Sequence, residues 1–219
     1  MYMFGVIICT YNGASRLRRV IESVCYQDGF DQYVDKLLIV DNCSTDSTRE
    51  IGLKLAEEHK KVEYLFEKTP GLSNARRCGI LNVTSPWIIF LDDDNFIQEG
   101  WLKGAVKYIE THDNIGAFNG HIVPSFDFDL TPQQLTLLKA AHRVLACSTW
   151  AETQLTPIRE SRWTPIGAGL VILREPLMRI LENGWLALEG RNKTALSSGE
   201  DAEMSLWVRA YGYKWGFCN

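Results

Sequence analysis

The chain contains the octapeptide Ile88-Ile89-Phe90-Leu91-Asp92-Asp93-Asp94-Asn95, in which an apolar run stops at three consecutive carboxylates. Residues 87–91 are apolar on both faces of an extended chain, which predicts a central strand of a covered, parallel sheet. In an open α/β sheet, ligands bind beyond the carboxyl ends of the strands. The three aspartates are therefore expected to lie at a binding edge of the sheet.

The spacing of these acids suggests a cation site. Continued strand alternation would point Asp92 and Asp94 one way and Asp93 the other. Two converging carboxylates with no basic neighbour repel each other unless a cation lies between them, and Mg²⁺ or Mn²⁺ prefers such oxygen ligands. Because Mg²⁺ commonly uses one or two carboxylates plus substrate phosphates, a phosphorylated ligand is also expected. The alternative is a solvated acidic turn after a core strand.

Composition sets outer limits. A chain of 219 residues that is 46% hydrophobic can bury the core of one α/β domain. The net charge of −4 disfavours a broad nucleic-acid surface but allows a nucleotide pocket. Six scattered cysteines, without a Cys-x-x-Cys pair or a zinc spacing, favour a reducing cytoplasm. Neither a signal peptide nor a membrane-crossing run is expected, so any association with the inner face of the membrane would be peripheral.

Strands and helices are predicted in alternation along the first half of the chain. The predicted strands are residues 4–9, 37–40, 62–67 and 87–91. The predicted helices are residues 15–27, a segment capped by Ser44 or Thr45 and running to 58, residues 75–80 after a turn over residues 70–74, and residues 101–109. This alternation, with polar loops after three strands, indicates a doubly wound, mostly parallel α/β sheet with its site at one edge. No Gly-x-Gly-x-x-Gly follows the first strand and no Walker loop is present, which disfavours a dinucleotide fold and a P-loop nucleotide triphosphatase.

The alternation is expected to fail between residues 115 and 163, where a helix over residues 131–146 and a mobile loop over residues 149–162 are predicted. A strand over residues 165–173 follows, in which Gly167 and Gly169 would let backbone or ligand approach closely. The chain is then predicted to form a helix over residues 176–183, a final helix after residues 199–201 and a strand near residues 213–217.

A series of segments in this order resembles the inverting nucleotide-sugar glycosyltransferases of family 2, which have the GT-A fold. The segments are Cys9-Thr10-Tyr11-Asn12, Val40-Asp41-Asn42-Cys43-Ser44-Thr45-Asp46, Gly71-Leu72-Ser73-Asn74-Ala75-Arg76, Phe90-Leu91-Asp92-Asp93-Asp94, Gly199-Glu200-Asp201-Ala202-Glu203-Met204 and Arg209-Ala210-Tyr211-Gly212-Tyr213. The resemblance implies a single GT-A domain over residues 1–219, with a nucleotide-binding half (1–110), a smaller acceptor-side half (111–219) and an end that falls short of many relatives.

The same resemblance implies which residues bind the donor nucleotide. Thr10, Tyr11 and Asn12 would line the nucleotide pocket. Asp41 would accept a hydrogen bond from the base, and a carboxylate suits the imide N–H of uracil or thymine, which favours UDP or dTDP. Arg76 resembles the basic residue on the nucleotide side of the family's site.

The resemblance also implies different roles for the acids at residues 92–94 and the acids at residues 200–201. Asp92 would contact the ribose, Asp94 would bind Mn²⁺ or Mg²⁺ at the donor diphosphate, and Asp93 would do either job or face away. Asp201 stands where the family has its general base, and a helix start would keep it ionised. Its alternative role is a helix N-cap. Glu200 would position the acceptor or hold a loop.

The implied activity is a metal-dependent, inverting transfer of one sugar from a nucleoside diphosphate to an acceptor hydroxyl, in cell-surface polysaccharide or glycolipid synthesis. The Gln-x-x-Arg-Trp element of processive relatives is absent, which favours single addition. One alternative is a nucleotide-sugar-binding module without catalysis. A poorer one is a haloacid-dehalogenase-like phosphohydrolase, which needs its paired aspartates near the chain start.

Overall fold

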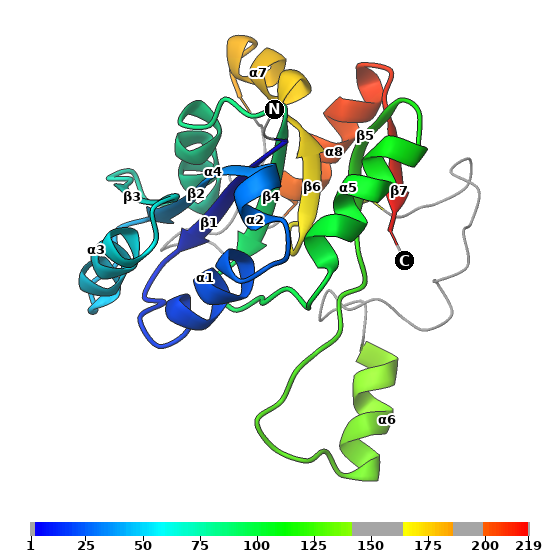
Figure 1. The fold of residues 1–219 in the computed structure, drawn as a ribbon. Coiled ribbons are helices and arrows are strands. Elements are labelled where there is room, and N and C mark those ends of the chain that lie inside the picture. The colour runs from blue at the N-terminus through cyan, green and yellow to red at the C-terminus, as the bar shows by residue number, and fades with distance from the viewer. Residues whose placement is uncertain (1–2, 142–163, 186–198, 219) are drawn as a thin grey trace.

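The computed structural model describes residues 3–141, 164–185 and 199–218, and within them seven strands form one sheet (Figure 1). The strands are β1 (Phe4–Thr10), β2 (Val34–Asp41), β3 (Val62–Phe66), β4 (Trp87–Asp92), β5 (Ile115–Asn119), β6 (Leu170–Leu173) and β7 (Lys214–Phe217). The helices are α1 (Leu17–Cys25), α2 (Phe30–Tyr33), α3 (Thr48–Glu58), α4 (Leu72–Leu81), α5 (Trp101–Thr111), α6 (Pro132–Ala141), α7 (Arg174–Glu182) and α8 (Glu200–Ala210).

The strand order is β3-β2-β1-β4-β6-β5-β7. Strands β1 to β4 pair in parallel, β6 is antiparallel to both β4 and β5, and β7 is parallel to β5. The carboxyl ends of β1, β2 and β4 therefore meet at one edge of the sheet, and β6 begins at that same edge. In Figure 1 the arrowheads of β1 and β4 both lie at this lower edge. The predicted mostly parallel α/β sheet is confirmed.

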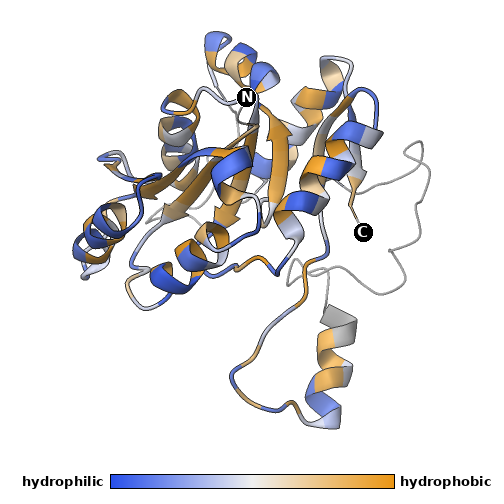
Figure 2. Cartoon of the chain, in the orientation of Figure 1, coloured by the Kyte–Doolittle hydropathy of each residue, from blue (hydrophilic) through white to orange (hydrophobic). Residues whose placement is uncertain are grey.

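Helices cover both faces of the sheet, which explains why its central strands are apolar on both sides. One core cluster packs the side chains of α1, α3 and α5 against alternate residues of β1 and β4, and the other packs α4, α7 and α8 against the remaining residues. Figure 2 shows the strands as largely hydrophobic and the outer faces of the helices as hydrophilic. Helix α6 stands apart from this body in Figure 1.

The structure corrects several predicted boundaries. Strand β5 lies where the alternation was expected to fail, because a five-residue run with glycine and alanine carries little strand signal without its neighbours β6 and β7. Helix α2 is short and was not predicted. Helix α3 begins at Thr48, whose backbone N–H donates to the Asp46 carboxylate, so the predicted cap at Ser44 or Thr45 is wrong.

The predicted strand over residues 165–173 begins only at Leu170, because backbone groups of residues 166–168 bond to a side chain instead of to a neighbouring strand. The Asn119 amide, at the end of β5 and fully buried, accepts from the Ile166 N–H (2.6 Å) and donates to the carbonyls of Ile166 (2.9 Å) and Ala168 (3.2 Å). Asn119 thereby holds residues 166–168 at the carboxyl edge of the sheet.

The predicted helix beyond residue 141 and the predicted loop 149–162 lie outside the described residues. Among the described helices, none combines the length and the apolar character needed to span a bilayer.

Candidate active site

Three predicted site residues meet at the sheet edge because of strand register. Thr10 pairs with Asp41 across β1 and β2, and Cys9 pairs with Asp92 across β1 and β4. Thr10 and Asp41 are buried, at 3% and 1% exposure. The apolar strands of residues 4–9, 37–40 and 87–91 end level with one another, so their first polar residues share one rim.

Asp92 lies at the centre of this rim. Its side chain is 44% exposed, yet burial by the surrounding protein is the main cause that raises the pKa of its carboxyl group. The Arg76 guanidinium opposes that rise, while the neighbouring carboxylates of Asp94, Asp201 and Asp93 add to it. An acid that is enclosed by protein yet open to solvent on one side, with three other acids in electrostatic range, is a typical functional-site arrangement.

Asp93 is bound by protein side chains. Strand β4 ends at Asp92, and the next two residues form a turn, so the predicted alternation does not continue. The Asp93 carboxylate accepts from the Thr10 hydroxyl (2.6 Å) and from Arg16 Nη2 (3.0 and 3.2 Å). A side chain at Gly13 would overlap both Thr10 and Asp93. Asp93 thus ties the loop after β4 to the loop after β1.

The expectation that the acids have no basic neighbour is wrong. Arg16 pairs with Asp93, and Arg76 Nη2 lies 3.9 Å from Asp92 Oδ1. Arg16 lies 77 positions from Asp93 in the sequence, and Arg76 lies on the helix that precedes β4, so neither pairing follows a local pattern. Sequence reasoning missed Arg16 altogether.

Asp94 is the carboxylate with room for a cation. It is exposed and has no hydrogen-bond or ion-pair partner within the described residues, while it lies close enough to Asp92 to raise the pKa of that group. In the described part of the chain, no three His, Cys, Asp or Glu side chains form a ready-made metal cage. One or two carboxylates facing an open site fit Mn²⁺ or Mg²⁺ whose remaining ligands are substrate phosphates and water.

Arg76 and Glu200 form a buried ion pair between the two sets of acids. Arg76 Nη1 donates to Glu200 Oε1 at 2.8 Å, and their side chains are only 4% and 5% exposed. Glu200 Oε2 also accepts from the Gly199 N–H (3.1 Å). Because Arg76 belongs to α4 and Glu200 begins α8, the pair joins the first half of the chain to the second.

Asp201 follows at the second position of α8. Its carboxylate accepts from the Gly167 N–H (2.7 Å) and from the Ala202 N–H (2.8 Å). The N-cap position belongs to Gly199, whose φ of 122° suits glycine, so the alternative in which Asp201 caps the helix is wrong. A side chain at Gly167 would overlap the Arg76 guanidinium and contact Asp201, so glycine there allows the close approach that the sequence predicted.

Tyr11 and Asn12 lie in the loop after β1, next to the loop after β2. Tyr11 is 48% exposed. The Asn12 side-chain oxygen accepts from the Thr45 N–H (2.8 Å), and the Asn12 N–H donates to Ser44 Oγ (2.9 Å). Asn12 adopts a positive φ of 53°, which asparagine tolerates better than most residues. Its side chain therefore holds the two loops together.

Asp41 is held by two donors that join it to β3 and to its own loop. The Ser44 N–H donates to Oδ1 (3.0 Å), and the Tyr64 hydroxyl donates to Oδ2 (2.6 Å). The sequence alone did not identify Tyr64 or Asn119 as site residues. Each side chain bonds to a segment that is distant in sequence, and the two segments meet only once the strands have paired. An asparagine that ends an apolar run was the one available signal for Asn119.

Comparison with known proteins gives a family match. A family model described as glycosyl transferase family 2 matches residues 5–175. The poly(ribitol-phosphate) β-N-acetylglucosaminyltransferase TarS of Staphylococcus aureus is 29% identical over 147 residues, which cover 64% of this chain and 26% of TarS.

Solved structures share the fold. Residues 1–349 of S. aureus TarS in complex with UDP-GlcNAc superpose with a TM-score of 0.70 at 16% identity, covering 99% of this chain and 59% of that one. The mannosyltransferase PcManGT of Pyrobaculum calidifontis, in complex with GDP-Man and Mn²⁺, gives a TM-score of 0.67 at 20% identity, covering 100% and 57%. The chain thus spans little more than half of these structures and about a quarter of the full TarS sequence.

Proposed function

Because the chain belongs to glycosyl transferase family 2, we propose that it transfers one sugar, with inversion, from a nucleoside diphosphate donor to an acceptor hydroxyl. The observation that carries this proposal is the convergence of Asp92, Asp94 and Asp201 on one rim of the sheet, with Arg76 among them. Inverting transfer needs a carboxylate at the acceptor and positive charge at the leaving diphosphate, on opposite sides of the sugar.

Asp201 is the proposed general base. As the acceptor oxygen bonds to the anomeric carbon, its proton passes to a free lone pair on the Asp201 carboxylate, and the bond from the sugar to the diphosphate breaks. The N–H groups of Gly167 and Ala202 hold the carboxylate in place without blocking every lone pair. Glu200 contributes on the acceptor side by fixing the start of α8.

The donor is proposed to lie along the first half of the chain. Thr10, Tyr11, Asn12 and Asp41 would form the nucleotide side, together with Arg76, Asp92 and Asp93, while Asp94 would hold Mn²⁺ or Mg²⁺. The metal would offset the charge that develops on the leaving diphosphate, so that no general acid is needed. Asp93 would act through the loop that it ties to Thr10.

Residues 1–110 would then form the nucleotide-binding half and residues 111–219 the acceptor-side half. UDP or dTDP is the favoured donor nucleotide, supported by Asp41 and by the UDP-GlcNAc complex of TarS. Similar folds also bind GDP-Man, so the fold does not select the base. A cell-surface polymer or glycolipid is the proposed acceptor, supported by the poly(ribitol-phosphate) in the name of TarS, with the enzyme acting in the cytoplasm or at the inner face of the membrane.

A panel of nucleoside diphosphates, each with and without Mn²⁺, tests this proposal by thermal unfolding. We expect UDP or dTDP with Mn²⁺ to raise the Tm most, because a ligand at 100 times its Kd stabilises a protein by about 2.7 kcal/mol. Release of UDP from UDP-sugars in the presence of polyol-phosphate acceptors then separates an enzyme from a binding module. If no nucleotide raises the Tm, the proposed function is wrong.

A further inference from the structure

We propose that Tyr64 sets the nucleotide-base preference of this site, by restricting Asp41 to one-point recognition of a pyrimidine imide and thereby rejecting guanine. The inference rests on the proposed function, since it concerns the donor nucleotide. Neither Tyr64 nor its hydroxyl is needed for the transfer step itself, so the residue is a positioning residue that acts through Asp41.

The geometry leaves Asp41 little capacity for a third partner. Its Oδ2 accepts from the Tyr64 hydroxyl at 2.6 Å, its Oδ1 accepts from the Ser44 N–H at 3.0 Å, and the residue is 1% exposed. A carboxylate oxygen accepts about two hydrogen bonds. Each Asp41 oxygen therefore has about one lone pair left, and almost all of the carboxylate surface is covered by protein.

Nucleotide bases differ in the number of hydrogen bonds that they can donate to such a carboxylate. Guanine presents two neighbouring donors, N1–H and N2–H, which pair with both oxygens of one carboxylate at the same time. Uracil and thymine present the single N3–H, which needs one oxygen. With the Tyr64 hydroxyl on Oδ2 and the Ser44 N–H on Oδ1, the two-point contact would use the last lone pair of both oxygens, whereas the one-point contact uses the last lone pair of one oxygen. An unmade hydrogen bond to a buried charged group costs more than a neutral one.

The surrounding structure holds the Tyr64 ring in this position. Tyr64 pairs with Ile39 in the register of β3 and β2, and a side chain at Gly52 of α3 would overlap the ring. Burial raises the pKa of the Tyr64 hydroxyl, and its hydrogen bond to Asp41 raises it further. The hydroxyl therefore stays protonated at neutral pH and remains a donor to Asp41.

The test compares the Kd values of UDP and GDP, each with Mn²⁺, by isothermal titration calorimetry for the unaltered chain and for Tyr64→Phe. We expect the unaltered chain to bind UDP more tightly than GDP. In the variant, the ratio of the GDP Kd to the UDP Kd should fall about tenfold, which corresponds to about 1.4 kcal/mol. A merely structural role would lower the Tm and weaken both nucleotides alike, with the ratio of the two Kd values unchanged.

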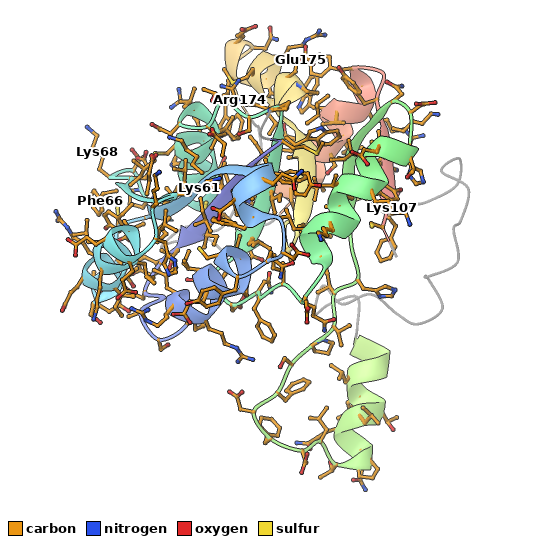
Figure 3. The ribbon with its side chains drawn as sticks, viewed as in Figure 1. Lys61, Phe66, Lys68, Lys107, Arg174 and Glu175 are labelled. Carbon is orange, nitrogen blue, oxygen red and sulfur yellow. The ribbon has the colours of Figure 1, made fainter. Side chains whose placement is uncertain are left out.

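Tyr213→Phe is the matched control, because the Tyr213 hydroxyl also donates to a carboxylate, that of Glu175, at 3.4 Å. Figure 3 shows Glu175 far from Phe66, which pairs with Asp41 at the end of β3. This control should leave the ratio unchanged. The inference is overturned if the unaltered chain prefers GDP, or if Tyr64→Phe has the same ratio of Kd values as the unaltered chain. Either result leaves the transferase proposal standing. If neither nucleotide binds the unaltered chain, the proposed function fails and the inference fails with it.

Discussion

Replacing Asp201 with asparagine is expected to lower kcat by about 10²- to 10⁴-fold, the usual contribution of a general base. The amide oxygen of asparagine can still accept the Gly167 N–H, so the local structure should persist. The variant loses the ability to take the acceptor proton, together with the hydrogen bond from the Ala202 N–H to the other carboxylate oxygen. UDP binding should stay close to that of the unaltered chain, because the nucleotide is proposed to lie on the other side of Arg76.

Turnover of a sugar nucleotide and a separate UDP titration measure the two effects. Glu203→Gln is the matched control, since Glu203 is another acid in the first turn of α8 and its carboxylate accepts from the indole N–H of the exposed Trp207 at 3.4 Å. This control removes the same charge from the same helix end and should retain activity. Unchanged turnover in Asp201→Asn would exclude Asp201 as the base.

Replacing Glu200 with alanine should cost about 3–5 kcal/mol of unfolding free energy, because it leaves the buried Arg76 guanidinium without its 2.8 Å partner. Asp92 lies 3.9 Å from Arg76 and can compensate for only part of the loss. Urea unfolding measures the effect. Glu63→Gln, which breaks the 2.8 Å ion pair with the partly exposed Lys36, should change stability by no more than about 1 kcal/mol.

A second variant separates charge from packing. The double substitution Arg76→Met with Glu200→Leu removes both charges and keeps much of the buried volume, so it should be clearly more stable than Glu200→Ala. It should also lose nucleotide binding, since Arg76 is proposed to face the donor. If Glu200→Ala is as stable as the unaltered chain, the pair does not join the two halves of the site in the way proposed here.

The sequence alone predicted the alternating strands and helices of residues 4–111, because their apolar periods are regular. It also predicted the shared rim, since the carboxyl ends of parallel strands meet at one edge. Asp92 was placed on this rim by the strand pattern, whereas Thr10 and Asp41 were selected as site residues by the family resemblance. The close approach at Gly167 was likewise predicted, although the glycine was placed inside a strand that in fact begins only at Leu170.

The remaining parts of the site depend on contacts between residues that are distant in sequence. Arg16 reaches Asp93 across 77 positions, and Arg76 reaches Glu200 across 124. No local pattern marks such partners, since an arginine in a loop or on a helix is usually a surface cation. Strand β5 was missed for a related reason: its short, small-residue run is stabilised by β6 and β7, which follow much later in the chain.

The central claim is that the exposed Asp94 beside Asp92 binds a divalent cation that in turn binds the donor diphosphate. The direct measurement is calorimetric titration of UDP with Mn²⁺ and with EDTA, for the unaltered chain and for Asp94→Asn. We predict that Mn²⁺ strengthens UDP binding to the unaltered chain and that Asp94→Asn loses this gain. UDP binding that is equally tight in EDTA, or an equal gain from Mn²⁺ in both proteins, would contradict the claim.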